Sequence, residues 1–322
     1  MLAADLPSRT ITLDSEEARA AAEADPPGFV QQYAEGTLII DEIQRMPSLT
    51  LAIKAAIDQD RRPGRFLLTG SSNLLPHRGM QDSLAGRAAS LDLFGLSVGE
   101  RLDSRDDFVA NVASALASGT ALASFSTAWD RLRLIEHVCG GSYPGLLQLT
   151  GRLHATWVDS YLERVIERDA TDLRTVYQPA RLKSLLRLIA ANQSGELVKA
   201  RMAEQAGIPA TSITSYLDLL RSLYLVNIVE PWTPNLTKRE VGRPKILVTD
   251  SGVASRLNGA TATRLQDFAS ADHLGGSLEG FVTAELLKQQ TWTPEPFRMF
   301  HFRDRTGAEV VSSAGFGGGC SS

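Results

Sequence analysis

Cysteine is scarce in this sequence of 322 residues, which contains only Cys139 and Cys320. The two form no C-x-x-C pair and belong to no cluster with the spacing of zinc ligands. A disulfide scaffold and a zinc module are therefore not expected, and this cysteine usage fits a reducing, cytoplasmic compartment. The five histidines are also scattered along the chain, so we interpret them as surface or packing residues rather than ligands. They are His77, His137, His154, His273 and His301.

Long apolar runs are absent as well. Residues 1–5 (MLAAD) are too short and too soon charged to form the apolar region of a signal peptide. Residues 108–129 carry no charge and approach the length of a membrane-spanning helix. Their composition is mostly small or polar, however, and Gly119 interrupts them. This pattern predicts small-residue helices packed inside a soluble protein, and no membrane partner.

The charge balance is slightly acidic, with 33 Lys+Arg against 37 Asp+Glu and a net charge of 33 − 37 = −4. Contents of 43% hydrophobic and 22% charged residues exclude wholesale disorder, collagen and coiled coil. An acidic chain of this kind can contact nucleic acid only through a local basic patch. The length predicts about two domains.

The first 100 residues alternate between strand and helix patterns. Strands are predicted at residues 9–14, 37–40 and 66–69, where apolar residues alternate with polar ones or form short buried runs. Helices are predicted at residues 16–23, after the capping residue Ser15, and at residues 49–57, with apolar residues at helical spacing. This order indicates an α/β fold with a parallel sheet and helical crossovers.

Two acids end the second predicted strand. Asp41 and Glu42 follow the apolar run 38–40, at the carboxyl edge where open α/β sheets bind ligands. An acid such as Asp41 can hold Mg²⁺ through water, because this ion prefers hard oxygen ligands. Glu42 can polarise an attacking water, since neighbouring strand residues point to different sides. The alternative is a solvated surface pair that merely ends a strand.

Polar side chains also follow the third predicted strand. Ser71, Ser72 and Asn73 can hydrogen-bond a phosphate oxygen or the attacking water, although such turns are common. Further along, Arg87 follows a flexible glycine, and its planar, always charged guanidinium suits a phosphate. The alternative for Arg87 is an ordinary surface arginine.

Together these segments resemble the P-loop ATPases of the AAA type, and more closely the prokaryotic group whose ATPase domain precedes a domain of unknown function. The matching text includes LIIDEIQ at 38–44, GRFLLTGSSN at 64–73, SLAGR at 83–87, LSVGE at 96–100, GGSYP at 140–144 and GSLEGFVTAEL at 276–286. The similarity spans roughly residues 9–310. It implies ATP and Mg²⁺ as cofactors, with Asp41 as the Mg²⁺ acid and Glu42 as the catalytic base. It also implies that Ser72 or Asn73 senses the γ-phosphate and that Arg87 takes part in catalysis.

One part of the family pattern is missing. Such ATPases use a G-x-x-x-x-G-K-[ST] loop to wrap the phosphates, and no Gly-Lys dipeptide occurs in this sequence. In the family the loop precedes the strand that matches residues 9–14, and only eight residues precede it here. We therefore expect an N-terminally truncated chain, or a misplaced start codon, with little or no ATP turnover.

The second half is mainly helical. Two helices, at 197–205 and from 212, flank a turn that contains Gly207, and strands at 225–229 and 245–248 follow. This order predicts a winged helix. Cationic residues near it offer a surface for the phosphates of DNA, while packing against protein is the open alternative. They are Arg181, Lys183, Arg187, Lys199, Arg201, Lys238, Arg239, Arg243 and Lys245.

The last part resembles an incomplete nuclease-like α/β lobe. Glu279, Glu285 and Asp304 remain, but the acid expected beside Glu309 and the E-x-K element are absent, so nuclease activity is not expected. A frameshift near residue 310 would explain the abrupt change to a Gly/Ser-rich tail. The predicted divisions are an AAA-type core lacking the P-loop at 1–103, a helical lid or linker at 104–150, and a helical and winged-helix region at 151–235. The lobe at 236–311 and a disordered tail at 312–322 complete them.

The sequence thus predicts a partial P-loop NTPase sheet of the AAA type, followed by helical and nuclease-like segments. The predicted function is that of an ATP-binding, catalytically impaired member of the family. A homo-oligomer is among the expected partners. One alternative is a non-catalytic module that binds DNA or protein through its winged helix. A second is a gene remnant that folds poorly because it exposes a sheet edge.

Overall fold

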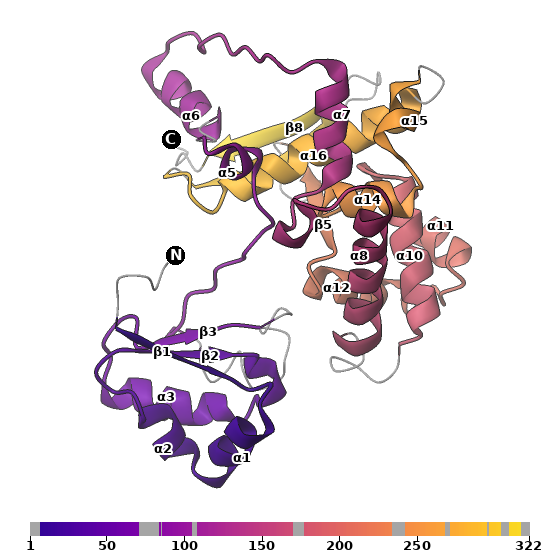
Figure 1. Ribbon diagram of the computed structural model, residues 1–322. Coiled ribbons are helices and arrows are strands. Elements are labelled where there is room, and N and C mark those ends of the chain that lie inside the picture. Colours follow the sequence, from indigo (N-terminus) through magenta and orange to yellow (C-terminus); the bar gives the residue numbers. More distant parts are fainter. Residues whose placement is uncertain are drawn as a thin grey trace. The chain divides into compact units, whose positions relative to one another are not determined.

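The computed structural model describes residues 7–70, 84, 86–104, 108–169, 177–233, 242–267, 271–294, 296–303 and 309–316. The chain divides into two compact units, Met1–Ser90 and Leu91–Ser322, which are described separately below (Figure 1). The first domain limit expected from the sequence, residue 103, lies further along the chain than this division.

A three-stranded parallel sheet forms the first unit. Its strands are β1 (Ser8–Thr12), β2 (Thr37–Asp41) and β3 (Phe66–Leu68), in the order β1-β2-β3. The helices between them are α1 (Glu16–Ala24), α2 (Pro26–Gln31), the 3₁₀ turn η1 (Ile43–Arg45) and α3 (Leu49–Gln59). The prediction of parallel strands joined by helical crossovers is confirmed.

Local sequence signals explain where these helices begin. The Ser15 side chain accepts a hydrogen bond from the Ala18 amide at 3.3 Å, which caps α1. Asp25 does the same for α2 through the Gly28 amide at 3.0 Å, ahead of prolines that suit the first helical turn. Asp25 therefore ends one helix and starts the next.

One face of this sheet is packed against all three helices (Figure 1). Leu38 and Ile40 of β2 are fully buried against Phe29 of α2 and Ile53 of α3. Ile39, between them in the strand, points to the other face by the alternation of strand side chains and is half-buried. The apolar run that follows Thr37 therefore supplies the core of the unit.

Helices and a five-stranded mixed sheet make up the second unit. Its sheet has the order β4-β6-β5-β7-β8, in which β5 and β7 are parallel and the other neighbours antiparallel. The strands are β4 (Gly195–Glu196), β5 (Val226–Pro231), β6 (Lys245–Val248), β7 (Phe297–Arg303) and β8 (Glu309–Phe316). The helices are α5 (Val98–Leu102), α6 (Phe108–Ser118), α7 (Arg131–Gly140), η2 (Pro144–Leu146), α8 (Gly151–Arg164), η3 (Val165–Asp169), α10 (Pro179–Ala191), α11 (Lys199–Gln205), α12 (Ile213–Ser222), α14 (Ser251–Leu257), α15 (Ala262–Gln266) and α16 (Ala271–Gln289).

The end of the chain differs from the disordered tail expected from Ser312 onward. Residues up to Phe316 belong to β8, whose backbone pairs with β7 through partners such as Phe300 and Ser313. A strand needs a partner backbone more than it needs large side chains, and β7 provides one. Residues 317–322 lie outside the described part of the chain.

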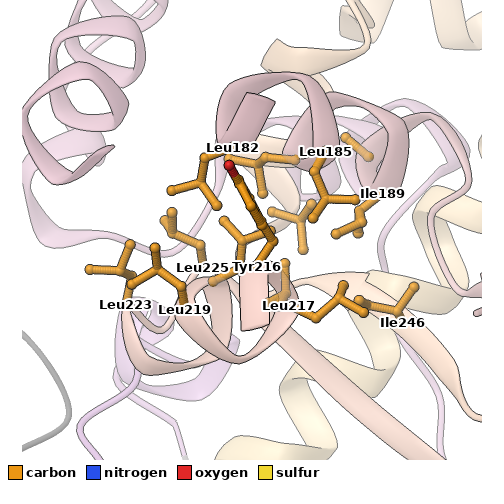
Figure 2. Packing of buried hydrophobic residues seen from close by; sticks show 14 of the residues in the cluster. Leu182, Leu185, Ile189, Tyr216, Leu217, Leu219, Leu223, Leu225 and Ile246 are labelled. Carbon is orange, nitrogen blue, oxygen red and sulfur yellow. The ribbon is translucent and has the colours of Figure 1, made fainter. Parts of the chain in front are cut away.

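A large part of the hydrophobic core of the second unit lies between α10 and α12. Figure 2 shows Leu182, Leu185 and Ile189 of α10 facing Tyr216 and Leu217 of α12. These positions recur at helical spacing, so each helix presents one apolar stripe to the other. Across the described residues, no helix has both the length and the apolar content needed to cross a membrane.

A buried aspartate joins two distant segments of this unit. The Asp250 carboxylate accepts hydrogen bonds from the Ser142 amide at 2.6 Å and the Ser142 hydroxyl at 2.7 Å. It also accepts from the Val253 amide at 2.9 Å and so caps α14. Gly252 allows the approach, because a Cβ there would lie 2.6 Å from the Cα of Gly141. The Ser142 carbonyl in turn accepts from the Leu96 amide at 2.8 Å.

Replacing Asp250 with alanine tests this junction. The change leaves three donors, from Ser142 and Val253, without their acceptor, and we expect it to lower the free energy of unfolding by about 3–5 kcal/mol. All four tryptophans lie in the second unit, so urea unfolding followed by tryptophan fluorescence reports on it. The control is Asp159→Ala, which removes an exposed ion pair with Arg256 and should cost no more than about 1 kcal/mol. Equal losses in the two variants would contradict this role of Asp250.

Candidate functional site

Asp41 and Glu42 lie at the carboxyl end of β2, the central strand of the first unit. Parallel pairing places the end of β3 beside them, and the Thr69 hydroxyl donates a hydrogen bond to Oδ1 of Asp41. The Ile43 amide also donates to the Thr69 carbonyl at 3.1 Å. The carboxyl ends of β2 and β3 therefore meet at one edge of the sheet. Ser71, Ser72 and Asn73 lie outside the described residues, and their roles stay predictions.

Glu42 has a left-handed backbone conformation, with φ of 58°. A residue with a side chain adopts this conformation at a cost of about 1–2 kcal/mol, and such residues gather at functional sites. In this protein the left-handed residue ends the strand and starts η1, which turns the chain sharply after Asp41. The sharp turn keeps the Glu42 carboxylate close to the edge of the sheet.

The surroundings of Glu42 shift its ionisation. Partial burial raises the pKa of Glu42 above its ordinary value of 4.5, while a hydrogen bond donated by the Gln44 side chain lowers it. The nearby charges of Asp41 and Asp14 raise the pKa further, and Arg45, which pairs with Asp14, lowers it. The result is a carboxyl with a raised pKa, as a general base requires.

The oxygen donors at this edge fit Mg²⁺ only together with other ligands. Asp41 offers a carboxylate fixed by Thr69, and carboxylate oxygen is a ligand type that Mg²⁺ prefers. Within the described ranges, no group of three or more His, Cys, Asp or Glu side chains gathers to hold a metal. Mg²⁺ at nucleotide sites commonly takes one or two carboxylates and completes its shell with phosphates and water. Asp41 therefore suits a nucleotide-bound ion.

Arg87 lies elsewhere in the unit. Its Nε and Nη2 atoms bond both oxygens of Asp58 at 2.8 and 3.1 Å, in the last turn of α3. Shortly after that turn, Arg62 donates to the Gly36 carbonyl at 3.0 Å, at the start of β2. The C-terminal end of α3 thus lies at the edge of the sheet opposite Asp41. The structure does not bring Arg87 together with the acid pair, and its part in catalysis stays a prediction.

Sequence reasoning missed several partners of the site. The sequence places Thr69 at the end of the third predicted strand, in the polar segment 69–73, but it does not predict the hydrogen bond from Thr69 to Asp41. The hydrogen bond from Gln44 to Glu42, within the matching segment 38–44, is not predicted either. The Asp14–Arg45 ion pair joins the segment after β1 to η1, and its members are 31 positions apart in the sequence (45 − 14). The hydroxyl immediately after a buried strand is the signal that predicts a polar role for Thr69 at this edge, whereas no local pattern predicts the ion pair.

In the second unit, acids assigned to the nuclease-like lobe are paired with lysines. Lys245 contacts Glu279 at 2.5 Å, and Lys288 contacts Glu285 at 2.6 Å, with both lysine side chains buried. Asp304 lies outside the described residues. The pairing also removes Lys245 from the cationic surface predicted for the wing, because a buried and paired lysine cannot meet a phosphate.

Comparison with known protein families finds two matches, one after the other along the chain. Residues 2–102 match the family described as AAA domain. Residues 131–264 match the family described as Domain of unknown function (DUF8612). No solved structure matches the chain at a significant level.

Two curated mycobacterial proteins are similar over most of the chain. They are Uncharacterized protein Rv2008c from Mycobacterium tuberculosis and Uncharacterized protein Mb2031c from Mycobacterium bovis, each 29% identical over 303 residues. The aligned part covers 93% of this chain and 60% of each relative, so the chain spans about three fifths of their length. The first unit is thus similar to an AAA-type P-loop ATPase domain, and a domain of unknown function follows it.

Proposed function

We propose that the first unit is the metal- and water-handling part of an ATP site. Asp41 is the acid that meets the nucleotide's Mg²⁺, and Glu42 orients the attacking water and accepts its proton. The observation that supports this best is the contact between Thr69 and Asp41, which joins the carboxyl ends of β2 and β3 beside Glu42. Bound Mg²⁺ would neutralise charge on the phosphates.

The physical state of Glu42 supports its role as base. Its carboxyl is half-buried, and the acids Asp41 and Asp14 disfavour its charge. Gln44 donates to one of its oxygens and so restricts the orientation of the side chain. A carboxylate that is both oriented and raised in pKa is better placed to take a proton than a freely solvated one.

These 322 residues do not contain the loop that wraps the phosphates, since no Gly-Lys dipeptide occurs in them. In P-loop enzymes the backbone amides and lysine of that loop supply both binding and charge stabilisation. Asp41 and Glu42 are anionic and cannot replace those positive groups. We therefore propose that this chain by itself is an impaired nucleotide-binding protein.

Restoring the loop provides the test. We expect the chain alone to hydrolyse ATP no faster than its Glu42→Gln variant. In a chimera that carries a strand, a G-x-x-x-x-G-K-T loop and a helix ahead of β1, turnover should appear. Glu42→Gln should then lower it by about 10²–10⁴-fold, the usual contribution of a general base. Phosphate release measures the rate, and circular dichroism verifies that both chimeras fold. An active chimera that tolerates Glu42→Gln would refute the assignment.

The raised pKa of Glu42 also predicts a pH effect on stability. Above pH 4.5 the unfolded chain loses the Glu42 proton before the folded chain does, so folding binds a proton. The free energy of unfolding of the wild type, compared with that of Glu42→Gln at the same pH, should therefore fall as the pH rises from 4.5 through the pKa of Glu42 in the folded chain. Hydrogen exchange of the β2 amides measures it at matched pH, because the first unit contains no tryptophan. A difference independent of pH would contradict the raised pKa.

A second candidate function rests on the elements around α12. We propose that α10, β4, α11, α12, β5 and β6 form a winged helix that contacts DNA. The order of these elements and the antiparallel arrangement β4-β6-β5 support this proposal. Exposed Arg187 and Arg201 belong to α10 and α11, and Arg221 lies in the last turn of α12. The exposed residues of α12 are Thr214, Asp218 and Arg221, so the helix itself adds no net positive charge. This favours phosphate contact through α10 and α11 over base reading by α12.

The salt dependence of DNA binding tests this candidate. We expect duplex DNA to bind with a steep salt slope, and the double change Arg187→Gln and Arg201→Gln to reduce that slope by about 1 per lost phosphate contact. Fluorescence anisotropy over a series of salt concentrations measures it. Arg152→Gln, at an exposed arginine of α8, is the matched control. Binding that is absent, or reduced equally by the control, would leave protein packing as the role of these helices.

A further inference from the structure

A hollow opens beside α7 in the second unit. It is lined by Arg101 of α5, by residues 128 and 130 before α7, and by the first turns of α7 itself, with a volume of about 550 Å³. This volume lies in the range of small-molecule pockets. These residues take no part in the proposed ATP site, because its acid pair lies in the other unit.

Cationic side chains in the hollow are held in place by their neighbours. Arg101 donates from Nη1 to the Gly141 carbonyl at 2.8 Å, at the C-terminal end of α7. The Arg133 guanidinium lies over the Trp129 ring, 5.8 Å from its centroid. Trp129 stacks on His137, with ring centroids 4.0 Å apart and planes within 4°. The aromatic stack therefore supports Arg133 and His137 together, which reduces the entropy that a ligand would have to overcome.

The arginine charges of the hollow affect the ionisation of His137. Burial lowers the pKa of His137, and the charges of Arg101 and Arg133 lower it further. Both guanidinium groups line the hollow together with the imidazole, and the lowered pKa favours the neutral form of His137. A neutral imidazole can donate or accept one hydrogen bond, while the two guanidinium groups attract an anion.

Two acids, Asp130 and Glu136, also line the hollow and add hydrogen-bond acceptors to it. Asp130 caps α7 by accepting from the Arg133 amide at 2.8 Å, so part of its carboxylate is committed to the helix. Glu136 is exposed at the rim. Carboxylates accept hydrogen bonds from hydroxyl or amino groups, and they repel a purely anionic ligand. The lining thus combines guanidinium and carboxylate groups, which suits a ligand that carries both an anionic group and hydrogen-bond donors.

We propose that this hollow binds a small phosphate monoester that also carries hydroxyl groups. The phosphate lies between Arg101 and Arg133, where planar guanidinium groups can bond its oxygens in pairs. The hydroxyl groups face Glu136 and Asp130. The hollow is open to solvent and is lined by seven of the described residues, an extent that suits a metabolite better than a nucleic-acid backbone.

Calorimetric titration of the full chain with ribose 5-phosphate tests the proposal, with ribose and inorganic phosphate as partial probes. We expect ribose 5-phosphate to bind more tightly than either. Arg133→Gln should weaken its binding by about tenfold or more, as expected for a lost charge-assisted bond. Glu136→Gln should weaken ribose 5-phosphate and leave or strengthen inorganic phosphate. Arg152→Gln, at an exposed arginine outside the hollow, should change nothing.

Arg101 also supports the Gly141 carbonyl, so its removal can damage the fold. Arg101→Lys keeps the charge but loses the planar pair of donors, and its thermal melt separates unfolding from lost binding. Absence of binding at millimolar ribose 5-phosphate by a folded chain would overturn the proposal. Equal weakening by Arg152→Gln, or displacement of the sugar phosphate by duplex DNA at the same arginines, would also overturn it.

Discussion

Parallel pairing of β2 between β1 and β3 is the constraint on which the candidate ATP site depends. In a parallel sheet all strands run the same way, so their carboxyl ends reach one edge together. Asp41 ends the middle strand and Thr69 follows its neighbour, and the register brings their side chains into contact. Leu38 and Ile40 anchor β2 in the helical layer, so a slip of the register would move apolar side chains out of the core. The packing of the sheet therefore positions the acids.

At the same edge of the sheet, Glu42 combines backbone strain with an electrostatic cost, and a purely structural turn would avoid both. Glu42 has a left-handed backbone, and its carboxyl is partly removed from water beside two other acids. Glycine or asparagine would fit this backbone with less strain. The ion pair between Arg45 and Asp14 and the hydrogen bond from Gln44 offset part of the electrostatic cost. Strain and a disfavoured charge at one residue are typical of a site whose chemistry needs them.

Local signals in the sequence predicted the strands of the first unit and its helices α1 and α3, but not α2, which begins at the prolines expected to break a helix. Contacts between distant residues could not be predicted. Short apolar runs and the cap at Ser15 predicted the strands and α1, because burial and capping act over a few residues. The partner of Arg87, however, is Asp58, and that of Lys245 is Glu279, and no pattern in the sequence reveals such pairs. The strand at Ser312 was missed for the same reason, since its order depends on pairing with β7 rather than on its own composition.

The ion pairs of α16 bear on the nuclease-like lobe that the sequence predicts. A metal site needs carboxylates that are free to bind the ion, but Glu285 accepts from the Val98 amide at 2.8 Å and pairs with Lys288. Lys288 also donates to the Leu96 carbonyl at 2.9 Å, so both side chains hold the segment that begins α5. Removing one partner of a buried pair leaves an uncompensated charge, so substitution of either residue destabilises the fold. Glu285 and Lys288 therefore act as structural groups that connect α16 to α5, and through Leu96 to the Ser142–Asp250 junction.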